Sequence, residues 1–153
     1  MSNMITETEQ MKQRIIEFSE SHHQNTEARF YDHIHPRFVT CDAAEKKLVF
    51  AYDFDKWGSN LREIVHGGVL AGAMDQCMGI LGFWATPGDV IPVTVSMQTS
   101  YLRPVPVNAT MYVQAQVTSA GRTLQNVVAK AWVEGGSPDK PALTATAVYM
   151  TKR

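Results

Sequence analysis

One long apolar segment limits what this chain can fold into. Residues 64–85, IVHGGVLAGAMDQCMGILGFWA, consist mostly of small and apolar side chains and predict a helix from about Gly67 to about Ala85. The segments that follow it read as strands with no helix between them: 90–104, 110–118, 122–134 and 142–152. Strands that follow one another without crossover helices pair antiparallel. The chain must therefore bury its one apolar helix against an antiparallel sheet.

The segment before this helix supplies further helical structure. Apolar side chains recur at helical spacing within residues 5–20 and predict an amphipathic helix there: Met11, Ile15 and Phe18. Residues 21–36 leave room for a second short helix that ends before Pro36, because the residue before a proline disfavours the helical conformation.

The organisation of the whole chain follows from these elements. Residues 37–42 and 47–54 flank the stretch AAEKK and predict a β-hairpin. Residues 1–153 therefore read as a single α+β domain in which an antiparallel sheet wraps around one central helix. Residues 1–36 form its N-terminal helical segment, and the length is ordinary for one domain.

The charge balance and the cysteines exclude several classes of protein. Fourteen basic and fifteen acidic residues give a net charge of -1, which argues against binding nucleic acid or a membrane surface through bulk charge. Cys41 and Cys77 have neither the spacing of a zinc site nor that of a disulfide framework. The polar, acidic start MSNMITETEQ does not resemble a signal peptide, so we expect a cytoplasmic protein.

A carboxylate lies in the middle of the apolar helix. On a helical wheel, the positions that share a face with Asp75 are mostly glycine or alanine: Gly68, Ala71, Gly72, Met78, Gly79 and Gly82. Each glycine costs about 1 kcal/mol of helix stability relative to alanine. The strip therefore indicates either tight packing of the helix or an approach by a ligand or a second backbone.

The residues before the helix point to chemistry. In His66-Gly67-Gly68, two small residues stand where the helix begins. The first amides of a helix have no internal partner and lie at the positive end of its dipole. Such amides can stabilise a developing oxyanion.

The distance between these two features predicts an oligomer. Gly67 and Asp75 are eight residues apart, which is about 12 Å along a helix. A catalytic carboxylate and an oxyanion donor must both lie within about 3.5 Å of the reacting atoms. One helix cannot meet this requirement, whereas two antiparallel helices related by a two-fold axis can. We therefore expect at least a dimer with two composite sites.

Four motifs in this order, HGGVLAGAMD, TSYLRPVPV, SAGRTL and ALTATAVYM, resemble the hot-dog-fold acyl-CoA thioesterases, specifically the phenylacetyl-CoA (PaaI-like) branch. The resemblance covers about residues 60–150. It implies the hot-dog fold and hydrolysis of an acyl-CoA to a carboxylic acid and coenzyme A. It also implies a homodimer, often paired into a tetramer, with active sites at the subunit boundary. Coenzyme A enters only as part of the substrate, and no other cofactor or metal is expected.

The resemblance assigns roles to five residues. The family's catalytic carboxylate corresponds to Asp75, and its oxyanion amide to that of Gly67. Asn60, six residues before the histidine, would help to hold the thioester or water. Thr94, near the start of the next strand, would orient the water. His66 would position neighbouring groups near the carbonyl.

Two features depart from the family pattern. Gly79 stands where some related enzymes carry a threonine, so a hydroxyl must come from Thr94. The segment LREIV before the histidine is bulkier and more charged than the glycine-containing family version. Whether Asp75 acts as a general base on water or attacks the thioester directly is left open by the sequence.

Other polar residues allow further assignments. Arg103, at the end of a strand, and Arg122, after Gly121 in a turn, are candidate contacts for the phosphates of coenzyme A. His33 and His35 in HIHP have the spacing of a metal-binding pair, but no second element offers zinc-like spacing.

Two alternative functions remain open at this point. A hydratase or dehydratase of the same fold would use a histidine and a carboxylate for proton transfer, which His66 and Asp75 would supply. A non-catalytic acyl-CoA-binding protein is the other alternative. The known sensors of this kind carry a DNA-binding helical unit, and the acidic N-terminal segment here lacks a basic recognition helix.

Overall fold

The computed structural model describes residues 6–21 and 29–152, and its element order agrees with the prediction. Three α-helices precede or interrupt six strands: α1 Glu7–Ser21, α2 Phe30–His33, β1 Arg37–Asp42, β2 Lys47–Asp53, α3 Gly67–Ala85, β3 Val93–Tyr101, β4 Thr110–Ala120, β5 Leu124–Val133 and β6 Leu143–Met150. A single 3-10 turn, η1 Lys56–Gly58, lies between β2 and α3.

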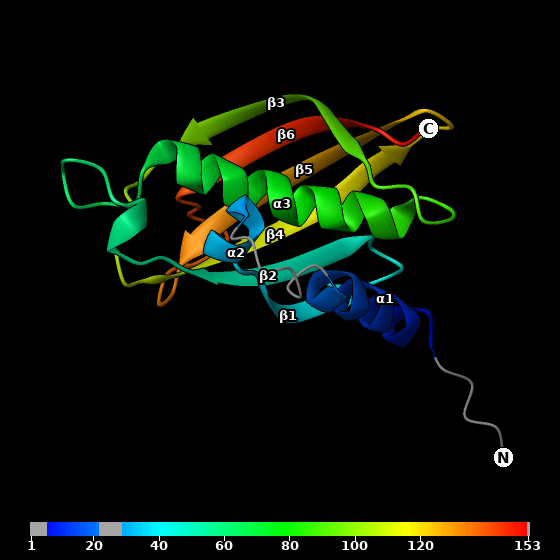
Figure 1. Cartoon of the computed structure of the whole chain (residues 1–153), viewed down its shortest axis with the longest axis horizontal. Helices are drawn as coiled ribbons and strands as arrows, with labels where there is room; N and C mark the ends of the chain where they lie inside the picture. The colour runs from blue at the N-terminus through cyan, green and yellow to red at the C-terminus, as the bar shows by residue number, and fades with distance from the viewer. Residues whose placement is uncertain (1–5, 22–28, 153) are drawn as a thin grey trace, which may run out of the picture.

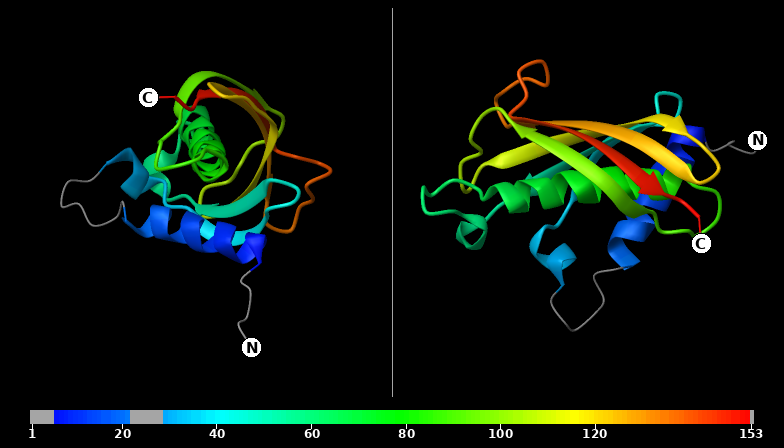
Figure 2. Two further views of the ribbon diagram at one scale, coloured as in Figure 1. Left: turned by 90° about the vertical axis from the view of Figure 1, so that its right-hand side faces the viewer. Right: turned by 90° about the horizontal axis from the view of Figure 1, so that it is seen from above.

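The strands form one antiparallel sheet in the order β1-β2-β4-β5-β6-β3. The sheet curves around α3, which lies in its hollow (Figures 1 and 2). The inward side of the helix is buried as a continuous stripe: Leu70, Ala73, Met74, Cys77 and Leu81. The predicted α+β architecture, with a sheet wrapped around one central helix, is confirmed.

The N-terminal helix α1 belongs to the packed body. Met11 and Ile15 are fully buried, as their helical spacing predicted. The Arg14 guanidinium donates hydrogen bonds to the carbonyls of Phe83 and Thr86, at 3.4 and 3.3 Å. Because these carbonyls lie at the C-terminal end of α3, the cation also faces the negative end of the helix dipole.

The short helix α2 ends before Pro36, as predicted, and packs on the long helix. A Cβ atom added to Gly72 would lie 2.4 Å from Cζ of Phe30. Gly82 is covered in the same way by Gln125 and Pro92, at 3.1 and 3.4 Å from such a Cβ. The glycine strip of α3 is therefore partly filled by the chain itself, and the part that stays accessible surrounds Asp75.

Strand β3 forms one edge of the sheet and pairs only with β6. Its register shifts between Thr94 and Ser96, and Thr94 lies beside Tyr149 of β6. Val93 and Val95 are exposed on this edge, at 65% and 53% of their full surface. Among the described residues, none of the helices is long and apolar enough to cross a membrane.

Candidate active site

The start of α3 presents a backbone N–H group that has no acceptor. His66 is the N-cap, and its Nδ1 accepts a hydrogen bond from the amide of Gly68 at 2.9 Å. Within residues 6–21 and 29–152, the amide of Gly67 has no hydrogen-bond partner. It lies at the positive end of the helix dipole and can donate to an oxyanion.

Tyr101 of β3 holds this turn from the side. Its hydroxyl donates to the carbonyl of Gly67 at 3.0 Å. A Cβ atom added to Gly67 would lie 3.4 Å from Cε1 of the same ring. Tyr101 therefore fixes the orientation of the peptide that carries the free amide.

The carboxylate of Asp75 is held on one oxygen only. Oδ1 accepts hydrogen bonds from the hydroxyls of Thr94, at 2.8 Å, and Tyr149, at 2.7 Å. The Tyr149 hydroxyl also lies 3.0 Å from the backbone carbonyl of Asp75. No described residue donates to Oδ2. One oxygen therefore fixes the carboxylate, and the other is free to act on water or on a carbonyl carbon.

Burial, together with the neighbouring Asp75 carboxylate, raises the pKa of Tyr149 well above its ordinary value. The phenol therefore stays protonated at every pH at which the protein is folded, and it remains a donor to Asp75. Its ring packs under the helix, 3.7 Å from the position of a Cβ on Gly79.

A pocket of about 170 Å³ opens at Asp75. The polar groups of its wall are Asp75, Thr94, Tyr149 and Gln76. The remaining lining is apolar and comes from α1, α3 and the segment before β3: Phe18, Gly79, Ile80, Ile91 and Pro92. This is the arrangement of a site that holds an apolar group next to a carboxylate.

A separate open pocket of about 380 Å³ lies at the start of α3. Its lining includes Gly67, Tyr101, Asn60 and two arginines, Arg62 and Arg103. The two pockets share no lining residue. Within one chain, the free amide and the carboxylate therefore cannot reach the same substrate atom, as the spacing along the helix predicted.

The structure distributes the predicted site residues between these two places. Thr94 lies at Asp75, but its hydroxyl donates to the carboxylate. Asn60 lies in the Gly67 pocket, where its Oδ1 accepts from the amide of Arg62 at 2.8 Å and shapes a tight turn. His66 caps the helix.

The two candidate phosphate ligands lie at opposite ends of the sheet. Arg103 follows β3 beside the start of β6, where its amide donates to the carbonyl of Ala142 at 3.1 Å. Arg122 lies in the β4–β5 turn, next to Thr123, whose carbonyl accepts from Thr151 after the end of β6. Only Arg103 lines one of the two site pockets.

Three residues of these pockets were not anticipated from the sequence. Tyr149 is the inward-facing polar residue of β6, and the alternation in ALTATAVYM is the signal that points to it. Arg62 carries no pattern that distinguishes it from a surface arginine. Phe18 was recognised as part of the apolar side of α1, but nothing in the sequence indicates that it reaches Asp75.

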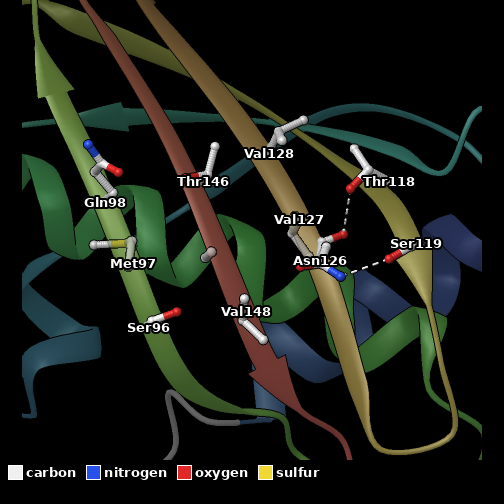
Figure 3. A pocket seen from close by; sticks show the side chains of 11 residues that line it. Ser96, Met97, Gln98, Thr118, Ser119, Asn126, Val127, Val128, Thr146 and Val148 are labelled. Carbon is white, nitrogen blue, oxygen red and sulfur yellow. Dashed lines mark hydrogen bonds between the residues drawn. The ribbon is translucent and has the colours of Figure 1, made fainter.

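Two other surfaces are less suited to catalysis. His33 packs against Trp57, with ring centroids 5.1 Å apart, and the described residues contain no group of three histidine, cysteine or acidic side chains that could hold a metal ion. A groove of about 540 Å³ lies on the face of the sheet opposite α3 (Figure 3). Its lining carries hydroxyl, amide and apolar side chains but no titratable group, so it offers no acid–base chemistry.

Comparison with known structures gives many matches to the fold. The PaaI protein from the phenylacetic acid degradation operon of E. coli matches with a TM-score of 0.76 and 13% identity, covering 94% of this chain and 96% of its own. A phenylacetic acid degradation-related protein of Ralstonia eutropha JMP134 matches with a TM-score of 0.75 and 20% identity, covering 90% and 98%. A Streptococcus mutans UA159 protein bound to acetyl-CoA matches with a TM-score of 0.69 and 16% identity, covering 84% and 96%.

Comparison with curated proteins gives no match. The model of one family, described as the thioesterase superfamily, matches residues 63–139. This range is half of the chain and includes the start of α3, Asp75, Thr94 and Arg103. The structural matches add that the sheet and helix have the arrangement of the hot-dog fold. The chain belongs to the thioesterase superfamily.

Proposed function

We propose that this protein hydrolyses acyl-CoA thioesters, with Asp75 as the residue that acts on water or on the thioester carbonyl. The observation that carries the proposal is the asymmetric Asp75 carboxylate. Its Oδ1 is held by two hydroxyls, while Oδ2 faces a pocket with an apolar wall. A fixed carboxylate beside an apolar pocket suits attack on an acyl group.

The reaction follows from this geometry. Either Oδ2 takes a proton from water, and the hydroxide attacks the carbonyl carbon, or Oδ2 attacks directly and water then hydrolyses the anhydride. In both routes the carbon–sulfur bond breaks, the thiol of coenzyme A leaves with a proton and the acyl group becomes a carboxylic acid. A backbone amide stabilises the oxyanion, and no metal or redox cofactor takes part.

The amide must come from a second copy of the chain, because Gly67 and Asp75 lie in separate pockets. The edge of β3 is the surface for this contact, since it is unpaired and carries exposed apolar side chains: Val93, Val95, Tyr101 and Leu102. Unprotected edges of this kind are templates for strand pairing.

The register of such a pairing supports a composite site. If two β3 strands pair antiparallel about a two-fold axis between Met97 and Gln98, Thr94 stands opposite Tyr101 of the partner subunit. Thr94 contacts Asp75, and Tyr101 contacts Gly67. The same axis therefore brings the carboxylate of one subunit toward the amide of the other. Pairing of two such dimers into a tetramer stays a prediction.

The substrate class is supported by the surroundings of Gly67. Arg62 and Arg103 line this pocket and offer two positive charges to a phosphorylated ligand. Similar structures include the S. mutans protein bound to acetyl-CoA. Membership of the PaaI-like branch rests on the sequence motifs and on the two phenylacetic acid degradation proteins among the structural matches.

The structure favours hydrolysis over the hydratase alternative. A hydratase needs a histidine that exchanges a proton near the carboxylate, but Nδ1 of His66 accepts from Gly68 at the helix start. A location in the cytoplasm agrees with the free thiols of Cys41 and Cys77, because a reducing compartment leaves cysteines unpaired.

The direct test measures thiol release from a panel of acyl-CoAs by the purified protein, with the Asp75→Asn variant as the blank. The panel includes short, medium and aromatic acyl groups, and a parallel assay follows hydration of an enoyl-CoA. Turnover of at least one acyl-CoA above the blank is expected. Hydration without thiol release would replace the proposal with the hydratase alternative.

A hybrid dimer tests the composite site. Asp75→Asn and Gly67→Pro subunits carrying different affinity tags are produced together, and the hybrid is isolated by both tags. One of its two sites then combines an intact Asp75 with an intact Gly67, so about half of the wild-type activity per dimer is expected. Sites contained within single chains would leave the hybrid as inactive as either parent.

Removal of positive charge tests where coenzyme A binds. Arg103→Ala is expected to raise KM about two- to fivefold, with a smaller change in kcat, because an exposed contact far from the carbonyl binds substrate and transition state alike. Steady-state kinetics at low and high salt provide the measurement, and the salt dependence should weaken in the variant. Arg122→Ala is the matched comparison. An effect confined to Arg122 would place the nucleotide at the opposite end of the sheet.

A further inference from the structure

The N-terminal helix contributes a side chain to the pocket that contains Asp75. Phe18 is the one α1 residue in the lining, and it stands with Ile80, Ile91 and Pro92 on the apolar side. The segment that carries Phe18 lies outside the residues 63–139 that the thioesterase superfamily model matches. The wall of the pocket is therefore completed by a part of the chain that the family core does not include.

Phe18 is held rigidly in this position. Its ring stacks on Phe83 of α3, with the ring centroids 4.2 Å apart and an angle of 30° between the planes. Arg14, one turn earlier, lies over the same Phe83 ring at 4.7 Å and donates to carbonyls at the end of α3. Ile15 is fully buried on the same helix. A side chain fixed by these contacts cannot swing away from a ligand at low cost.

The position of Phe18 along α3 relative to Asp75 gives it a definite function. The part of α3 that lines the pocket runs from Asp75 to Ile80, about 7.5 Å along the helix axis, and Phe83 lies beyond it. An acyl group whose carbonyl is at Asp75 and whose chain follows this wall runs toward the ring of Phe18. The pocket measures about 170 Å³. A cavity of about 150 Å³ admits benzene in another protein, so the space suits an acyl group of about one ring or six carbons.

We propose that Phe18 sets the upper size limit of the acyl group by closing the end of the pocket away from Asp75. This inference rests on the proposed thioesterase function. It assigns acyl selectivity to α1, while the hydrolytic residues lie on α3 and the strands. The aromatic ring is the stop, and its contact with Phe83 keeps it in place.

The test compares butanoyl-, hexanoyl-, octanoyl- and decanoyl-CoA with the full-length protein. Phe18→Ala is expected to raise the ratio of kcat/KM for octanoyl-CoA to that for butanoyl-CoA by about tenfold or more, because each additional buried methylene contributes about fourfold. Phe18→Trp should lower the same ratio. Ile16→Ala is the control, since Ile16 lies on the same helix but lines a different surface pocket and should leave the ratio unchanged.

The ratio separates selectivity from folding and from the proposed function. Loss of folded protein lowers both kcat/KM values equally and leaves their ratio constant. An unchanged ratio in both Phe18 variants, in a protein that hydrolyses acyl-CoAs, would overturn this inference and leave the thioesterase proposal intact. Absence of hydrolysis by the wild-type protein would instead overturn the proposed function.

Discussion

Replacing Asp75 with asparagine is expected to lower kcat for thioester hydrolysis by about 10²-fold or more, the usual range for loss of a catalytic base. The amide oxygen of an asparagine can still accept from Thr94 and Tyr149, which now donate to Oδ1. The NH2 group then takes the place of Oδ2, which has no protein partner among the described residues. The side chain therefore keeps its anchors and loses the oxygen that reacts.

Thermal unfolding and kcat measured on the same Asp75→Asn preparation provide the test. We expect a melting temperature close to that of the wild-type protein and an unchanged oligomer. A purely structural role for Asp75 predicts the reverse, with a lower melting temperature and normal turnover per folded molecule. That outcome would remove the central residue from the proposed mechanism.

Replacing Gly67 with proline is expected to lower kcat by about 10²- to 10³-fold, the range found when one oxyanion donor is removed. Proline lacks only the N–H group that is free here, and it is well tolerated at the first position of a helix. The preceding residue, His66, already has the extended conformation that proline requires, with φ −61° and ψ 137°. The substitution therefore deletes the donor without breaking the helix.

Gly67→Ala is the matched control, because alanine adds a Cβ beside Tyr101 as proline does but keeps the N–H group. Activity within a few-fold of wild type is expected for alanine, and steady-state kinetics of the two variants side by side give the comparison. Equal activity in the proline and alanine variants would show that this amide does not stabilise the oxyanion.

Local patterns were enough to predict the main elements. The apolar helix begins and ends where the sequence indicated, at Gly67 and Ala85, because small residues and TPGD mark its limits. Strand order was not predictable in detail, since local alternation does not say that β6 pairs with both β5 and β3. The family resemblance supplied Thr94, whereas its contact with Asp75 depends on a register shift in β3 that no local pattern reveals.

The residues that sequence reasoning missed are those that act across long separations. Tyr149 meets Asp75 from 74 residues away, and Phe18 reaches the same pocket from the N-terminal helix. The glycine strip shows the opposite limitation. Its small residues were recognised, but a helical wheel cannot tell whether the space is filled by a ligand or, as at Gly72, by a ring of the same chain.

The separation of the two site pockets within one chain has a consequence for how activity depends on protein concentration. If each site needs groups from two subunits, a single folded chain holds two incomplete halves and turns over nothing. Dilution below the dissociation constant of the dimer then lowers specific activity through mass action, although every molecule stays folded. A newly synthesised subunit is silent until it meets a second one, so assembly itself is the step that switches hydrolysis on.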